Sequence, residues 1–129
     1  MTDTFAIALI QHACSDALAD NLAAVEKAVR EAAARGAQVI CLQELCLNRY
    51  FCSAEDASFF SLAEPADGPL VSRIQRLAAE LSVVVVFPFF ERRGAGVYHN
   101  SAAIIDADGE LLGMYRKMHI PDDPLYYEK

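Results

Sequence analysis

The strongest constraint on the fold is the alternation of apolar, strand-like runs with an amphipathic helical segment. Residues 5–11 form an almost continuous apolar run, which is typical of a strand buried on both faces. Apolar residues at helical spacing then predict a helix that begins between Ser15 and Asn21 and ends at Gly36. Residues 38–43 predict a second strand. This βαβ unit predicts two parallel strands and therefore an α/β protein.

The rest of the chain is predicted to contribute one more helix and three more strands. In chain order we expect a long loop over 45–68, a helix over 70–81 with Pro69 in its first turn, a central strand over 83–90, a turn over 91–96, and hairpin strands over 97–105 and 110–116. Asp108 and Gly109 supply the turn signal of the hairpin. A loop as long as 45–68 is usually functional.

The last stretch, residues 118–129, is punctuated by proline and predicts neither a helix nor a strand. The second face of the predicted sheet is therefore under-supplied with helices. We expect residues 1–129 to be the N-terminal, incomplete part of a single larger domain.

Composition excludes several classes of function. The chain has 129 residues, is 54% hydrophobic and carries a formal net charge of −7. Such an acidic chain is not expected to bind nucleic acid, because phosphate binding needs clustered lysine and arginine. No run approaches the roughly 20 apolar residues that span a bilayer, and the first residues do not resemble a signal peptide. We expect a cytoplasmic protein that does not bind membranes.

Two charged residues directly follow apolar strand-like runs. Glu44 follows the second predicted strand, and Lys117 follows the last one. A strand end that projects a charged group into a cleft is a common place for catalytic residues, and a carboxylate beside an ammonium can act as a base and an oxyanion stabiliser. Most glutamates at strand ends simply face solvent. The long loop after Glu44 favours the functional interpretation.

The four cysteines, Cys14, Cys41, Cys46 and Cys52, are expected to be reduced thiols. A zinc site built from Cys41, Cys46 and Cys52 with a histidine is a minor alternative, because the cysteines lack the paired C-x-x-C spacing of structural zinc sites. We expect no metal and no cofactor.

Several short motifs occur in one collinear order and together resemble the nitrilase (carbon–nitrogen hydrolase) superfamily, with the N-carbamoylputrescine amidohydrolase branch as the most similar. The motifs are Leu42-Gln43-Glu44, Tyr50-Phe51-Cys52, residues 63–69, Phe89-Phe90-Glu91, Asn100-Ser101 and residues 115–122. The resemblance runs through essentially the whole chain. It implies that the chain is the N-terminal portion of a four-layer α-β-β-α sandwich.

The resemblance also implies roles for individual residues. Glu44 matches the general base of a Glu–Lys–Cys triad, Lys117 the lysine that stabilises the tetrahedral intermediate, and Glu128 a second, supporting glutamate. Tyr50, Asn100 and His119 are expected to contact the substrate. The nucleophilic cysteine of the family lies beyond residue 129, and none of the four cysteines occupies its place. We therefore expect residues 1–129 alone to be inactive.

The implied reaction is hydrolysis of N-carbamoylputrescine to putrescine, carbon dioxide and ammonia, a step of polyamine biosynthesis. One alternative is a different carbamoyl or amide substrate, such as a β-ureido acid or an N-carbamoyl amino acid, for which Arg49 is a candidate carboxylate ligand. Another alternative is a non-catalytic interaction module. The resemblance further implies a homo-oligomer built from dimers.

Overall fold

The computed structural model describes residues 4–122, 124 and 127–128. Its regular elements are β1 (Ile7–Leu9), α1 (Leu18–Ala34), β2 (Val39–Cys41), the 3₁₀ helices η1 (Phe51–Ser53) and η2 (Ala57–Leu62), α2 (Pro69–Leu81), β3 (Val84–Gly94), β4 (Val97–Ile105) and β5 (Leu111–Arg116). The predicted order of strands and helices is confirmed. The predicted loop over 45–68 contains the two short 3₁₀ helices.

The five strands form one mixed sheet in the order β1-β2-β3-β4-β5. The pairs β1–β2 and β2–β3 are parallel, as the βαβ pattern predicts, and the pairs β3–β4 and β4–β5 are antiparallel. The predicted central strand is the middle strand of this sheet. Parallel strands end at the same edge of a sheet, so the segments that follow β1 and β2 emerge together.

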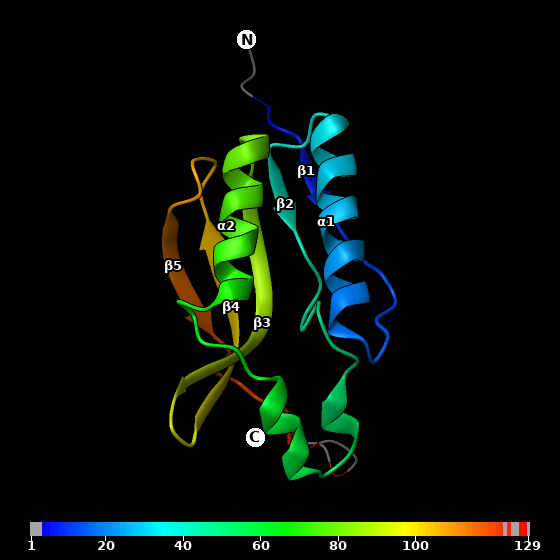
Figure 1. The fold of residues 1–129 in the computed structure, drawn as a ribbon, viewed down its shortest axis with the longest axis vertical. Helices are drawn as coiled ribbons and strands as arrows, with labels where there is room; N and C mark the ends of the chain where they lie inside the picture. Colours follow the sequence, from blue (N-terminus) through cyan, green and yellow to red (C-terminus); the bar gives the residue numbers. More distant parts are fainter. Residues whose placement is uncertain (1–3, 123, 125–126, 129) are drawn as a thin grey trace.

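Both long helices cover the same face of the sheet (Figure 1). The core lies between them and the sheet, and its fully buried side chains include Val25, Ile40, Ile74, Val85 and Phe87. Two exposed ion pairs, Arg30–Glu80 and Arg73–Glu26, join the outer surfaces of α1 and α2. The α1 and α2 layer and the sheet account for two layers of the expected four-layer sandwich.

The prediction that residues 5–11 are buried on both faces is wrong. The strand is shorter, and Phe5, Ile7 and Leu9 are 65%, 59% and 82% exposed. The reason is that β1 is an edge strand and its sheet carries helices on only one face. A run of apolar residues records which side chains favour burial, but it does not say what covers them.

The prediction of a turn over residues 91–96 is wrong for its first part, because β3 continues through Gly94. Glu91 pairs with His99 of β4 across this extension, and the loop before α2 adds a bridge between Glu64 and Glu91 on the other edge. Glu91 is therefore enclosed within the sheet and is only 1% exposed.

The two 3₁₀ helices, the end of β5 and the C-terminal segment gather at one end of the sheet (Figure 1). A backbone hydrogen bond of 2.7 Å from Tyr127 N to the carbonyl oxygen of Cys52 ties the C-terminal segment to η1. This end of the sheet brings together the residues discussed next. In the described part of the chain, no helix has the length and apolar character to span a membrane.

Candidate active site

Glu44 is held in place by the residues around it. Gln43 accepts a hydrogen bond from His12 N at 2.6 Å and donates one to His12 O at 2.8 Å, which ties the end of β2 to the segment after β1. Leu45, almost fully buried, has a φ of 48°, an uncommon conformation for a branched residue. The buried amide of Asn21 in α1 donates to the carbonyl oxygen of Leu47 at 2.8 Å. The turn that carries Glu44 is therefore anchored on both sides.

Lys117 and Asn100 are brought together by the last hairpin. The β4–β5 pairing continues one step beyond the strand, because Lys117 N donates to Asn100 O at 2.8 Å. The two side chains therefore start from neighbouring points of the sheet. Glu128 reaches the same place from the C-terminal segment, which Cys52 holds through its backbone carbonyl.

Five side chains, those of Glu44, Lys117, Glu128, Asn100 and Tyr50, form one compact cluster. The ammonium nitrogen of Lys117 lies 2.9 Å from Oε1 of Glu44 and 2.9 Å from Oε1 of Glu128. The amide of Asn100 donates to both carboxylates, at 2.6 Å to Glu44 and 2.8 Å to Glu128. The hydroxyl of Tyr50 donates a hydrogen bond of 2.9 Å to Oε2 of Glu128. Glu44 and Lys117 are 73 residues apart in sequence, yet they form an ion pair.

The two carboxylates of the cluster differ in exposure. The side chain of Glu128 is 9% exposed and that of Glu44 is 50% exposed, with Lys117 between them at 27%. Burial alone would raise the pKa of Glu128, but hydrogen bonds from Asn100, Lys117 and Tyr50 outweigh it and lower that pKa below its ordinary value. Glu128 is thus a fixed structural anion, whereas Glu44 is open to a substrate.

The ammonium of Lys117 stays charged at neutral pH. Its burial lowers the pKa of the amine, and the hydrogen bonds to Glu128 and Glu44 raise it by more, so the net shift is upward. A permanent positive charge at this point can offset negative charge that develops on a substrate oxygen.

We expect the Glu128 cluster to make stability depend on acid pH. Because the folded-state pKa of Glu128 lies below its ordinary value of 4.5, its contribution is present above that value and is lost as the pH falls through the folded-state pKa. Urea unfolding between about pH 5 and pH 3 should show a smaller loss of stability for Glu128→Gln than for the unsubstituted protein. The exposed Glu110, changed to glutamine, is the control. Parallel curves for all three proteins would contradict the assignment.

A second ion pair supports Lys117 from the preceding residue. Arg116 forms two hydrogen bonds with the buried carboxylate of Glu91, at 2.8 and 2.6 Å, and Ser101 donates a third at 2.6 Å. Burial would raise the pKa of Glu91, but the hydrogen bonds from Arg116 and Ser101 lower it overall. This buried anchor fixes the end of β5 and hence the point from which Lys117 projects.

Lys117, Asn100 and Glu128 line a cavity of about 710 Å³. Its other walls come from η1, η2 and the β3–β4 hairpin, and include several aromatic side chains. Glu44 borders a smaller hollow of about 290 Å³ that Tyr50 also lines. The charged cluster lies between these two spaces, where a small molecule can reach it.

The six predicted site residues have different outcomes in the structure. Glu44, Lys117, Glu128, Asn100 and Tyr50 come together in the cluster. Asn100 and Tyr50, expected to contact substrate, are hydrogen-bonded to the carboxylates. His119 is exposed and makes no hydrogen bond to any of these groups in the described part of the chain. The roles of all six residues stay predictions.

Sequence reasoning missed the residues that hold the site in place, namely Asn21, Gln43, Glu91 and Arg116. All four are polar or charged, and Asn21 and Glu91 are almost fully buried at 3% and 1% exposure. Asn21, in an otherwise apolar helical stripe beside Leu22 and Val25, is the one signal that could have been found. The partner of Glu91 depends on strand register, which the sequence does not display.

None of the four thiols is arranged as a nucleophile of the cluster. Burial raises the pKa of Cys14, Cys46 and Cys52. Cys52 lines the same cavity as Lys117 and Glu128, and the negative charge of Glu128 raises the pKa of this thiol further. Within the described residues, no group of three or more histidine, cysteine, aspartate or glutamate side chains is arranged to hold a metal ion.

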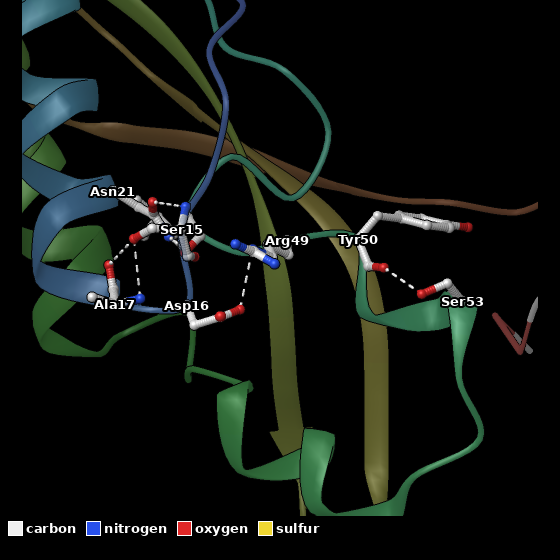
Figure 2. A network of polar contacts seen from close by, with 8 residues as sticks. Ser15, Asp16, Ala17, Asn21, Arg49, Tyr50 and Ser53 are labelled. Carbon is white, nitrogen blue, oxygen red and sulfur yellow. Dashed lines mark hydrogen bonds and ion pairs between the residues drawn. The ribbon is translucent and has the colours of Figure 1, made fainter.

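Arg49, the candidate ligand for a substrate carboxylate, is paired with Asp16 in the structure. Its guanidinium forms an exposed ion pair of 3.2 Å with Asp16, just before α1, while the ring of the neighbouring Tyr50 extends to the other side (Figure 2). Arg49 lines the smaller hollow that Glu44 borders, and it does not line the cavity that contains Lys117. Its role as a ligand for a substrate carboxylate stays a prediction.

Residues 6–129 match the carbon-nitrogen hydrolase family, and the chain belongs to it. The chain is 51% identical to an N-carbamoylputrescine amidase from Arabidopsis thaliana over 124 residues, which are 95% of this chain and 41% of that protein. It is 42% identical to a citrullinase from Francisella tularensis, covering 95% of this chain and 43% of that protein. The chain thus spans about two fifths of the length of these relatives.

A solved structure has the same fold. The crystal structure of a carbon-nitrogen hydrolase from Helicobacter pylori G27 superposes with a TM-score of 0.90 at 35% identity, covering 96% of this chain and 43% of that chain. The expected nitrilase-like architecture is therefore confirmed for the described part, and the resemblance seen in the sequence motifs is confirmed by the family match.

Proposed function

We propose that the protein to which these residues contribute is a thiol-dependent hydrolase of non-peptide carbon–nitrogen bonds, with N-carbamoylputrescine as its substrate. The observation that carries the proposal is the meeting of Glu44, Lys117 and Glu128 at hydrogen-bond distance beside a cavity. The relatives named N-carbamoylputrescine amidase, at 47–51% identity, support the choice of substrate.

In this proposal the attacking thiol belongs to a segment beyond residue 129. Glu44 takes the thiol proton, the sulfur bonds to the carbamoyl carbon, and the C–N bond to putrescine breaks as the amine receives the proton. Lys117 offsets the negative charge on the tetrahedral oxygen. Glu44 then takes a proton from water, whose oxygen bonds to the carbamoyl carbon. The C–S bond breaks, the sulfur takes the proton back from Glu44, and the carbamic acid that leaves decomposes to carbon dioxide and ammonia. Glu128 and Asn100 hold the side chains of Lys117 and Glu44 in position through hydrogen bonds.

The proposal is tested by measuring ammonia and putrescine released from N-carbamoylputrescine by the full-length polypeptide that carries residues 1–129. We expect equal amounts of the two products. We also expect a thiol reagent to inactivate the enzyme, and the presence of substrate to slow this inactivation. Residues 1–129 alone should release neither product. Absence of turnover by the full-length polypeptide, with no protection from the reagent, would favour a non-catalytic interaction module instead.

A different carbamoyl or amide substrate on the same three residues is the second candidate, because one relative is named citrullinase. A cytoplasmic location and a homo-oligomer built from dimers remain predictions that accompany the proposal. Fractionation and light scattering of the full-length polypeptide test them.

A further inference from the structure

The larger cavity has an aromatic wall in addition to its charged cluster. Four ring contacts connect the wall continuously: the centroids are 5.6 Å apart for Phe59 and Phe51, 4.9 Å for Phe51 and Phe90, 5.7 Å for Phe90 and Tyr98, and 4.5 Å for Tyr98 and Phe60. Phe60 is 50% exposed. The other four rings are half-buried. A group of rings that lines a cavity beside a polar cluster is typical of a ligand-binding wall.

Two acidic residues border the same cavity between η1 and η2. Glu55 is exposed and has no hydrogen-bond or ion-pair partner among the described residues. Asp56 accepts a hydrogen bond from Ser58 N at 2.8 Å, and hydrogen bonds from Ser58 lower its pKa, so it is an anion at neutral pH. Within the described residues, no arginine lines this cavity, and its one lysine is Lys117. This side of the cavity therefore presents the carboxylates of Glu55 and Asp56 and the faces of aromatic rings.

We propose that the aromatic wall, with Glu55 and Asp56, binds the primary ammonium end of a linear substrate whose carbamoyl group lies at Glu44 and Lys117. An alkylammonium is attracted both to carboxylates and to the faces of aromatic rings, while the methylenes of its chain pack against the same rings. A carboxylate at that end of the substrate would meet two negative charges instead. The inference rests on the proposed function and assigns the residues that choose among carbamoyl substrates.

The test compares three ureas on the full-length polypeptide. N-carbamoylputrescine carries the ammonium, and n-pentylurea replaces it with a methyl group. 4-Ureidobutyrate has a carboxylate in place of the terminal aminomethyl group, which puts its oxygens at the position of the ammonium nitrogen. The readout is the ratio of kcat/KM for N-carbamoylputrescine to kcat/KM for n-pentylurea. We expect Glu55→Gln with Asp56→Asn to lower this ratio about fivefold to tenfold, and Phe60→Leu to lower it about threefold.

The substitutions are chosen to keep the fold. Asparagine caps a helix as well as aspartate does, so Asp56→Asn removes charge and retains the hydrogen bond to Ser58. Glu31→Gln, on the exposed side of α1, is the control and should leave the ratio unchanged.

Each outcome separates the inference from the proposed function. A lower ratio in the variants, with n-pentylurea still hydrolysed as before, supports the inference. An unchanged ratio in the double variant overturns the inference and leaves the proposed function intact. A preference of the unsubstituted protein for 4-ureidobutyrate overturns the inference and the choice of N-carbamoylputrescine as substrate, and leaves the proposed carbon–nitrogen hydrolase intact. Failure of the unsubstituted protein to hydrolyse any of the three ureas overturns the proposed function and the inference with it.

Discussion

Changing Glu44 to glutamine is expected to lower kcat of the full-length polypeptide by roughly 10²–10⁴-fold, the usual contribution of a general base. Glutamine can still accept a hydrogen bond from Lys117, so the cluster should keep its shape while it loses the group that moves protons. KM should change little, because the substitution removes proton transfer rather than substrate contacts. Steady-state release of ammonia from N-carbamoylputrescine measures both parameters.

The companion substitution, Lys117→Ala, separates charge stabilisation from proton transfer. Losing one preorganised cation at a developing oxyanion costs roughly 10²–10³-fold in kcat. It also leaves Glu44 and Glu128 facing each other across Asn100 without the ammonium between them. Matched controls are Glu31→Gln and Lys27→Ala, a pair whose side chains are 65% and 78% exposed on α1. Turnover within twofold of normal for Glu44→Gln or Lys117→Ala would contradict the proposed roles.

Changing Arg116 to methionine is expected to have the largest effect on stability, lowering the free energy of unfolding by about 3 kcal/mol. The substitution leaves the carboxylate of Glu91, which is 1% exposed, with Ser101 as its remaining hydrogen-bond donor. Breaking a buried pair in this way costs about 3–5 kcal/mol, and we take the lower end because the side chain of Arg116 is 34% exposed and partly reached by water. Urea unfolding at pH 7 measures the change.

A second variant distinguishes an unpaired charge from lost packing. Changing Glu91 to leucine together with Arg116→Met removes both charges and should recover much of the stability, because no buried charge is then left without a partner. The control is Arg92→Met, on the neighbouring, exposed position of β3, which should change stability by about 0.5 kcal/mol or less. Equal losses for Arg116→Met and Arg92→Met would contradict the buried-anchor interpretation.

The elements of this fold could be predicted because each carries a local signal. The strand β4 has the predicted bounds, Val97–Ile105, and α2 begins at Pro69, one residue before the expected start. Proline in the first turn and glycine after the last are read directly from the chain. The C-terminal part of β3 was missed because Glu91 and Arg92 are charged, and their place in a strand depends on partners in β4 and in the loop before α2.

The candidate site could be predicted only as a set of residues. Motif order pointed to Glu44, Lys117 and Glu128, but their distances follow from the parallel pairing of β1 to β3 and from the register of the β4–β5 hairpin. The same register turned Asn100 toward the carboxylates, and the hydrogen bond between Tyr127 and Cys52 in η1 holds the C-terminal segment beside Tyr50. For both Asn100 and Tyr50 the sequence had suggested contacts with substrate. The register of β3, β4 and β5 also places Arg116 beside Glu91, and no local sequence pattern predicts that ion pair.

The sequence by itself determined the order of helices and strands, the acidic balance and the identity of the charged residues that follow β2 and β5. These properties depend on residues that are neighbours in the chain, so hydrophobic periodicity and turn residues predict them. The tertiary structure alone decided which face of the sheet is covered, which carboxylate is buried and which is open, and that Lys117 lies between the two. Those properties depend on contacts between residues up to 78 positions apart, and only the folded backbone brings such residues together.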